Sequence, residues 1–152
     1  MGCVVGQRFS RDVTVNQESI REFARLVGDE NPLHHDKGLA ALTRFGGLIA
    51  SGTHSASIMM GAVAAFTAQF GPSLGLEYSV KLRKPVRAGE RLRIEWEVSA
   101  IERNPLLGGR VVSFNGRLIN DKDETVVSGF AKGLIMANAD AFSEKSAVPS
   151  RA

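Results

Sequence analysis

The longest apolar segment of the chain, residues 55–70, constrains the fold most strongly. Its sequence is SASIMMGAVAAFTAQF, which contains few polar residues and no charged ones. A segment this short does not cross a lipid bilayer comfortably. A helix of this length that is apolar on nearly all sides is typical of a protein core. We therefore predict a buried helix over roughly residues 53–70, ended by Gly71 and Pro72.

After Pro72 the pattern changes to an alternation of apolar and polar residues. The segments that show it are LGLEYSVKLRKPV (74–86), ERLRIEWEVSAIER (90–103), RVVSFNGRLIN (110–120) and ETVVSGFAKGLIM (124–136). Alternation with period two is typical of half-buried strands, and strands joined by short connections form an antiparallel meander. The apolar helix can cover the apolar face of the sheet. The sequence thus predicts an α+β domain, an antiparallel sheet wrapped around a long buried helix.

An amphipathic helix is expected within residues 14–29. The apolar residues that share one stripe at helical spacing are Ile20, Phe23, Ala24 and Val27. Thr14 or Asn16 can cap the start of this helix, and Gly28 is placed to end it. A second, short helix is expected over about residues 36–45.

The chain has 152 residues, which suits one domain. We expect a single domain over residues 1–137 and a flexible C-terminal tail over residues 138–152, where the residues are small and polar. Cys3 is the only cysteine, so an internal disulfide or a thiolate metal cluster is excluded. No secretory leader opens the sequence, and we expect a cytoplasmic protein.

The segment DENPLHHD, residues 29–36, combines turn-forming residues with carboxylates and imidazoles. Two interpretations remain open from the residues alone. One is a capped surface turn, because Asp29 and Asn31 are both good helix caps. The other is a catalytic loop, in which Pro32 begins a short helix and Asp29 and His34 grip one water molecule. His35, next to His34, would then point elsewhere.

A basic stretch lies within the predicted strands. Its cations are Lys81, Arg83, Lys84, Arg87, Arg91 and Arg93, interrupted only by Glu90. It is either a solvated strand face and turn, or a surface for phosphate on a nucleic acid, a membrane or a nucleotide-bearing ligand. The nearby aromatic residues Tyr78 and Trp96 fall on the apolar phase of their strands, which argues against an RNA-binding surface.

The loop and its surroundings resemble the MaoC-like dehydratases, also called R-specific enoyl-CoA hydratases. The residues that carry the resemblance are Phe23, Gly28, Asp29, Asn31, Pro32, Leu33, His34 and Ala41. The segment YSVKLRKPVRAGERL gives weaker support, and the likeness covers most of residues 14–136. It implies a hot-dog fold, a homodimer whose sheets join edge to edge, and a trans-2-enoyl thioester or its (R)-3-hydroxy counterpart as substrate. It assigns Asp29 and His34 as the catalytic pair.

The resemblance also assigns the backbone amide of Gly52 as the oxyanion donor. The first N–H groups of a helix have no partner within it, and the helix dipole favours negative charge there. A glycine lets a thioester oxygen approach closely. Ser51 suits the N-cap of the same helix, and the two interpretations are compatible.

The chain departs from the family pattern in this region. Many members have His-Gly where this chain has Ser51 and Gly52, and a serine where it has Met60. His54 lies two residues after Gly52, as in an SGTH variant within the broader family. We count Ser51, His54 and Asn31 among the candidate substrate-binding residues, and we interpret Met60 and its neighbour Met59 as core packing.

Phosphates of a coenzyme A thioester offer an economical explanation for the basic stretch. The candidate phosphate-binding residues are Lys81, Arg83, Lys84 and Arg87. Acyl carrier protein is the alternative carrier of the acyl group. No metal and no cofactor is expected, since coenzyme A enters only as part of the substrate, and neither nucleic acid nor a membrane is an expected partner.

These observations predict a hydro-lyase of fatty acid metabolism that interconverts 2-enoyl and (R)-3-hydroxyacyl thioesters. Two alternatives remain. Acyl-CoA thioesterases share the fold and hydrolyse the thioester instead. The chain could also be a non-catalytic, acyl-thioester-binding subunit of a hetero-oligomeric dehydratase.

Overall fold

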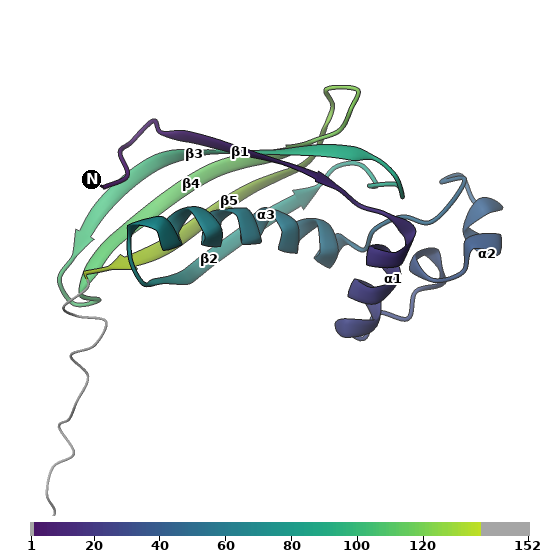
Figure 1. Ribbon diagram of the computed structural model, residues 1–152, viewed down its shortest axis with the longest axis horizontal. Coiled ribbons are helices and arrows are strands. Elements are labelled where there is room, and N and C mark those ends of the chain that lie inside the picture. The colour runs from purple at the N-terminus through teal and green to yellow at the C-terminus, as the bar shows by residue number, and fades with distance from the viewer. Residues whose placement is uncertain (1, 138–152) are drawn as a thin grey trace, which may run out of the picture.

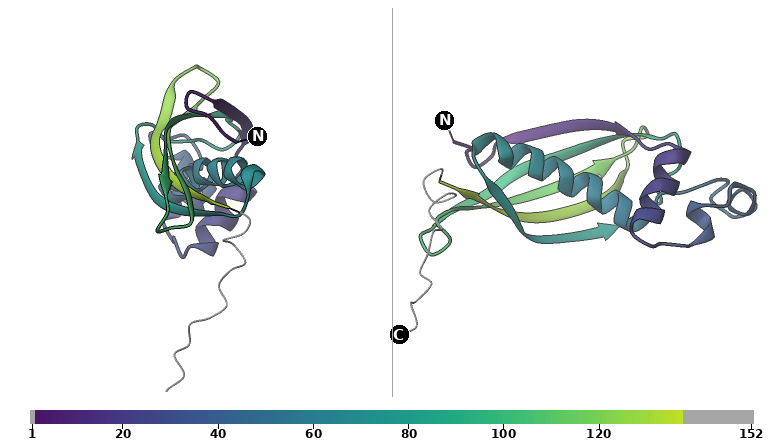
Figure 2. Two further views of the ribbon diagram at one scale, coloured as in Figure 1. Left: turned by 90° about the vertical axis from the view of Figure 1, so that its left-hand side faces the viewer. Right: turned by 60° about the horizontal axis from the view of Figure 1, so that its bottom comes forward.

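The computed structural model describes residues 2–137. A five-stranded antiparallel sheet curves around one long helix (Figures 1 and 2), as the sequence predicts. The strands are β1 (Arg8–Thr14), β2 (Ser73–Leu82), β3 (Arg91–Asn104), β4 (Gly109–Ile119) and β5 (Thr125–Met136). The helices are α1 (Gln17–Leu26), α2 (Lys37–Ala41) and α3 (Gly52–Thr67), with 3-10 turns η1 (Pro32–His34) and η2 (Ala68–Phe70). The predicted tail, 138–152, lies outside the described residues.

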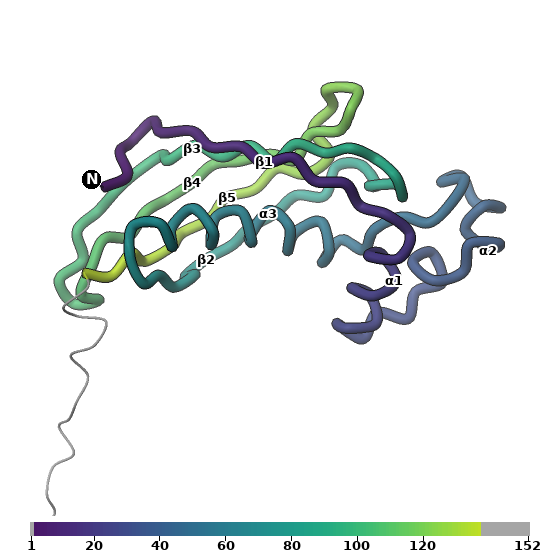
Figure 3. The backbone as a smooth tube through the Cα atoms, viewed as in Figure 1, coloured from purple at the N-terminus to yellow at the C-terminus, as the bar shows by residue number. Residues whose placement is uncertain are grey.

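The strand order is β1-β3-β4-β5-β2, so the predicted four-strand meander is only partly right. Strands β3, β4 and β5 form a meander, but β2 pairs with β5 instead of β3. The connection from β2 to β3 crosses the end of the sheet (Figure 3). Arg83 and Lys84 donate backbone hydrogen bonds to Val126 in β5, and Gly89 donates one to Val15, just after β1. Neighbouring strands lie only about 5 Å apart, so even a short connection can pass two of them.

Strand β1 is an edge strand that the sequence analysis does not predict. It pairs with β3 from Arg8 opposite Glu97 to Thr14 opposite Arg91. Its apolar residues, Phe9 and Val13, are only partly buried. The alternation is therefore weak in the sequence, and pairing with β3 is what makes this segment a strand. Thr14, one of the two candidate helix caps, is its last residue.

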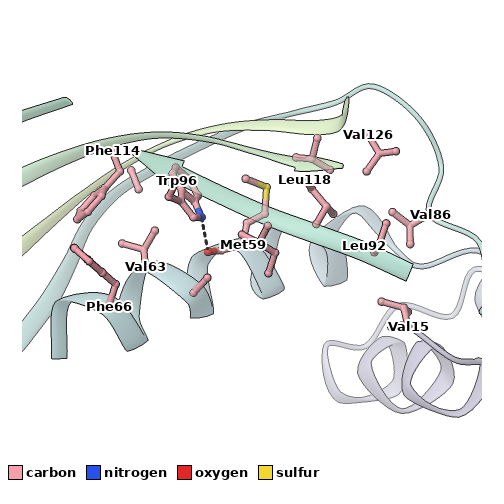
Figure 4. Packing of buried hydrophobic residues seen from close by; sticks show 14 of the residues in the cluster. Val15, Met59, Val63, Phe66, Val86, Leu92, Trp96, Phe114, Leu118 and Val126 are labelled. Atoms are coloured by element: carbon pink, nitrogen blue, oxygen red, sulfur yellow. Dashed lines mark hydrogen bonds between the residues drawn. The ribbon is translucent and has the colours of Figure 1, made fainter. Parts of the chain in front are cut away.

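The hydrophobic core lies between α3 and the inner face of the sheet (Figure 4). Large side chains that meet there include Met59, Val63, Phe66, Trp96 and Phe114. The indole N–H of Trp96 donates to the carbonyl of Met59 at 3.2 Å, which ties the sheet to the helix. A Cβ on Gly116 would collide with the Trp96 ring, so the residue opposite the indole has to be glycine. Met59 is a core residue, as predicted.

The predicted buried helix is α3, but only one of its sides is buried. One sheet covers only one side of a helix, and the other side of α3 remains exposed. The edge strand β2 beside it also exposes leucines that the alternation pattern places on a half-buried face; Leu82, for example, is 57% exposed. We call this apolar surface the α3–β2 face; it comprises Gly61, Ala64, Ala65, Ala68, Leu74, Leu76 and Leu82.

Helix α1 lies beyond the first turn of α3 (Figure 1). Asn16 caps it: Asn16 Oδ1 accepts from the Ser19 N–H at 2.8 Å, and Ser19 Oγ accepts from the Asn16 N–H at 3.1 Å. Gly28, with φ +73°, ends the helix in the left-handed region that glycine adopts without strain. Val27 is 47% exposed, contrary to the predicted stripe, because it is the C-cap where the chain leaves the helix. Helix α2 is shorter than the predicted residues 36–45.

Candidate active site

The loop between α1 and α2 is held in shape by its own side chains. Asp29 Oδ1 accepts a hydrogen bond from the Asn31 N–H at 3.0 Å. Asn31 Oδ1 accepts from the Leu33 N–H at 3.1 Å, which caps η1, and Pro32 occupies the first position of that turn. Asp36 in turn caps α2 by accepting from Leu39. The turn-forming residues therefore give the loop a defined conformation without help from a ligand.

The short 3-10 turn brings Asp29 and His34 together. Asp29 Oδ2 lies 3.4 Å from His34 Nε2. The other ring nitrogen, Nδ1, is 2.8 Å from the backbone carbonyl of Ile49. A carbonyl oxygen only accepts, so Nδ1 carries the hydrogen. In a neutral ring this leaves the lone pair of Nε2 directed at the carboxylate side of the site.

The two side chains differ in their access to solvent. The His34 side chain is 7% exposed, and that of Asp29 is 32% exposed. A separation of 3.4 Å is slightly longer than a direct hydrogen bond, so one water molecule at the Asp29 carboxylate can also reach the imidazole. The arrangement can bind a water molecule and exchange protons with it.

His35 is not part of the Asp29–His34 side-chain pair, as predicted, but it has a structural contact. Its Nε2 lies 2.6 Å from the backbone carbonyl of Asp29 and donates to it. The carbonyl of His35 itself accepts from Arg21 Nε at 3.1 Å. These bonds attach the Asp29 backbone to α1, so His35 supports the position of the carboxylate. The position of His35 next to His34 in the sequence does not indicate this role.

The first turn of α3 faces the same end of the molecule. Ser51 is its N-cap and accepts through Oγ from the His54 N–H at 3.2 Å, and its carbonyl accepts from the Ser55 N–H. Among the described hydrogen bonds, none uses the N–H groups of Gly52 and Thr53. A Cβ on Gly52 would collide with Cδ1 of Leu82. The glycine therefore lies beneath the last residue of β2.

His54 is buried against α1. The residue is 7% exposed, and its ring stacks on Phe23 with centroids 4.5 Å apart and planes 6° apart. Its Nδ1 is buried and has no hydrogen-bond partner among the described residues. Burial lowers the pKa of His54, and repulsion from the protonated form of His34 lowers it further. The ring is therefore held in its neutral form. No periodicity in the sequence indicates the stack between residues from two separate helices.

The basic stretch is divided by the fold. Arg93 lies on β3, where it pairs with Glu95 at 2.8 Å, and β3 is separated from β2 by two strands. Lys81 and Arg83 flank Leu82 and hence lie at the end of the molecule that contains Gly52.

The four candidate phosphate-binding cations are all exposed, but three of them already have partners. Arg83 Nε donates to Ser128 Oγ, Lys84 pairs with Glu124, and Arg87 Nε donates to the carbonyl of Phe45. The Lys84 ammonium group lowers the pKa of the Glu124 carboxyl. Among the described residues, the Lys81 side chain alone of this set has neither an ion pair nor a side-chain hydrogen bond.

A hollow of about 630 Å³ lies elsewhere, on the outer surface of β1, β3 and β4. The residues that line it include Arg8, Glu95, Glu97 and Arg117. Neither Asp29 nor His34 belongs to it. Its charged groups already pair with one another, as Arg8 does with Glu97 at 2.7 Å. The chemistry of the loop, and not the size of this hollow, identifies the candidate site.

Within residues 2–137 no cluster of three or more histidine, cysteine, aspartate or glutamate side chains is arranged to hold a metal ion. The helices in this part of the chain are also too short or too polar to cross a membrane.

Comparison with known proteins identifies relatives of the chain and of its fold. A UPF0336 protein of Streptomyces avermitilis is 33% identical over 126 residues, which cover 78% of this chain and 81% of the relative. A 3-hydroxybutyryl-CoA dehydratase of Methylorubrum extorquens is 30% identical over 88 residues, covering 57% of this chain and 55% of the relative. The unliganded R-hydratase PhaJ1 of Pseudomonas aeruginosa superimposes with a TM-score of 0.76 at 30% identity, covering 88% of this chain and 83% of that one.

The superposition identifies the architecture as the predicted hot-dog fold. The sequence model of the MaoC-like domain matches residues 5–105, which include α1, the Asp29–His34 loop, α3 and β2. The chain belongs to the MaoC-like domain family.

Proposed function

We propose that this protein is an acyl-thioester hydratase or dehydratase that interconverts trans-2-enoyl and (R)-3-hydroxyacyl thioesters. The observation that carries the proposal is the Asp29–His34 pair, 3.4 Å apart, with His34 Nδ1 bonded to the Ile49 carbonyl. A fixed imidazole whose Nε2 can accept a proton, next to a partly exposed carboxylate, suits general acid–base chemistry on water. The R-hydratase and dehydratase relatives support this choice of reaction.

In the hydration direction, the Asp29–His34 pair removes a proton from water as the water oxygen bonds to C3 of the enoyl group. The electrons of the C2=C3 bond move toward the thioester carbonyl, and C2 then takes a proton from the pair. The N–H of Gly52 at the first turn of α3 donates to the thioester oxygen while it carries negative charge. Dehydration follows the same steps in reverse and releases water.

We further propose that the carrier is coenzyme A and that Lys81 and Arg83 bind its phosphates. Both residues are exposed and adjoin Leu82, whose side chain lies over Gly52, so they lie at the same end of the molecule as the site. An ammonium and a guanidinium group are suitable donors for phosphate oxygens. Lys81 is the strongest candidate, because Arg83, Lys84 and Arg87 are already engaged by Ser128, Glu124 and the Phe45 carbonyl respectively.

The α3–β2 face supports a homodimer. Strand β2 pairs on one side only, with β5, and its other edge is open. An open edge next to exposed leucines is a surface that a second copy can extend by strand pairing. We expect a dimer in light scattering, and Ala64→Arg on α3 should convert it to a monomer, whereas Lys122→Glu in the distant β4–β5 turn should not. A strictly monomeric wild-type protein would refute this part of the proposal.

The reaction is tested by following the loss of enoyl absorbance when the protein is mixed with crotonyl-CoA. Asp29→Asn should lower kcat/KM at least ~100-fold, the scale of a positioned acid or base. Glu30→Gln removes an exposed carboxylate from the adjacent position and is the matched control, with activity near that of wild type. Free thiol release without hydration would indicate a thioesterase. Binding of enoyl thioesters of several lengths without turnover would indicate a non-catalytic subunit.

A further inference from the structure

His54 is a buried polar residue at the candidate site that has no role in the reaction steps proposed above. It belongs to the first turn of α3, two residues after Gly52, and its ring stacks on Phe23 of α1. The residue is only 7% exposed, and Nδ1 has no hydrogen-bond partner among the described residues. An unmet hydrogen bond of this kind disfavours the folded chain, and a bound ligand that completes it removes the penalty.

In the described conformation Nδ1 is buried, so it meets a ligand only after the ring turns. A half-turn about the Cβ–Cγ bond leaves the imidazole in the same plane and so preserves the stack on Phe23. The same rotation moves Nδ1 to the opposite edge of the ring. Phe23 is itself only partly buried. The stack therefore fixes the plane of the imidazole and is compatible with both orientations of Nδ1.

The chemistry of a neutral imidazole limits which chemical groups of a ligand can bind it. A neutral ring both donates and accepts hydrogen bonds, whereas an imidazolium ring only donates. A hydroxyl group or a water molecule is the partner that can do both in return. The oxygen that adds to the enoyl group is such a partner at both ends of the reaction, first as water and then as the 3-hydroxyl.

We propose that His54 is a positioning residue whose Nδ1 hydrogen-bonds the oxygen that is added to, or removed from, C3 of the acyl chain. This inference rests on the proposed function, and it gives the site a third polar group beside Asp29 and His34. His54 does not replace either of them, because it moves no proton and only orients the oxygen between them. Its neutral state also places no positive charge beside His34, which has to accept a proton.

Three variants separate this role from packing. His54→Phe keeps an aromatic ring to stack on Phe23 and removes both nitrogens. His54→Asn places a polar atom near the position of Nδ1, and His54→Gln places one near that of Nε2. We expect His54→Phe to lower kcat for crotonyl-CoA about tenfold or more, the scale of one hydrogen bond made in the transition state, with KM changed less than about threefold.

His54→Asn should recover part of this loss, and His54→Gln should recover less. Thermal stability of His54→Phe should equal or exceed that of wild type, because the variant removes an unmet buried group. Wild-type kcat in His54→Phe would overturn the proposal. A fall in both kcat and melting temperature, with no advantage of Asn over Gln, would also overturn it, since that pattern indicates packing alone.

A binding measurement distinguishes failure of this inference from failure of the proposed function. The protein has three histidines, so the ¹⁵N ring signals of His54 can be assigned by their loss in His54→Phe. We expect (R)-3-hydroxybutyryl-CoA to shift the Nδ1 signal and butyryl-CoA, which lacks the hydroxyl, to leave it unchanged. Equal responses to the two ligands would overturn the role of His54 even if hydration occurs. A hydroxyl-specific shift would support it even if crotonyl-CoA is not hydrated.

Discussion

The loop that carries Asp29 and His34 and the first turn of α3 meet at the candidate site, but their polar groups are satisfied differently. In the loop, Asp29, Asn31 and His34 all have hydrogen-bond partners within the protein. At the start of α3, the N–H of Gly52 and Nδ1 of His54 have none among the described residues. The hydrogen bonds of the loop are thus satisfied without a ligand, whereas the start of α3 has polar groups that can bind one.

This difference suits the two tasks that hydration requires. Proton transfer needs side chains held in fixed positions, which local hydrogen bonds provide. Stabilising an enolate oxygen needs donors that are free until the charge develops. An unsatisfied buried group lowers stability by about 1–3 kcal/mol, so leaving one at the helix start is a local cost that a site for a polar ligand can explain.

The largest expected loss of activity comes from removing Nε2 of His34 while keeping the hydrogen bond to the Ile49 carbonyl. His34→Asn retains a donor near the position of Nδ1 for the Ile49 carbonyl and lacks Nε2. We expect kcat/KM for crotonyl-CoA to fall at least ~100-fold, with little change in melting temperature. His35→Gln, which keeps a donor for the Asp29 carbonyl, is the control and should lose little activity. Equal losses in the two variants would contradict the assignment of His34.

The second-largest effect tests whether position 52 has to be glycine for access of the ligand to its N–H or for packing against Leu82. Gly52→Ala adds a methyl group where Cδ1 of Leu82 lies and also narrows the approach to the backbone N–H. We expect activity to fall about tenfold, and Leu82→Ala in the same chain to restore stability without restoring activity. If the double variant is as active as Leu82→Ala alone, the glycine serves packing only.

A smaller effect is expected from the cap within the loop. Asn31→Ala removes the acceptor for the Leu33 N–H and should lower the free energy of unfolding by about 1 kcal/mol. Activity should fall only severalfold, because η1 loosens without losing a reacting group. Asn31→Asp keeps the acceptor and should restore most of the stability in urea titrations. A catalytic loss as large as that of His34→Asn would show that Asn31 contacts the substrate instead.

The smallest effect is a pH dependence at the helix start. The pKa of His54 is lowered from 6.5 in the folded chain, so on acidification the unfolded chain takes up this proton first. Between the folded and unfolded pKa values the unfolded state binds more protons, and stability therefore decreases as the pH falls below about 6.5. His54→Phe should reduce the difference in melting temperature between pH 7 and pH 5. An unchanged difference would show that other groups cause it.

Local residue chemistry was sufficient to predict the elements whose bonds are local. The capping of α1 by Asn16 and its end at Gly28 depend on residues within a few positions of one another, as does the Asn31 bond within η1. The alternation in β3, β4 and β5 likewise predicts strands, because one face of each packs on α3. The proximity of Asp29 and His34 follows from a short turn that Pro32 begins.

The tertiary structure decided the features that depend on distant partners. Strand β2 pairs with β5 because the connection to β3 crosses the sheet, and β1 is a strand only because β3 supplies its hydrogen bonds. The stack of His54 on Phe23 joins residues from α1 and α3, and the exposed side of α3 follows from a sheet that covers one side only. Caps and alternation are encoded in neighbouring residues, whereas strand order and buried polar contacts depend on the relative positions of whole elements.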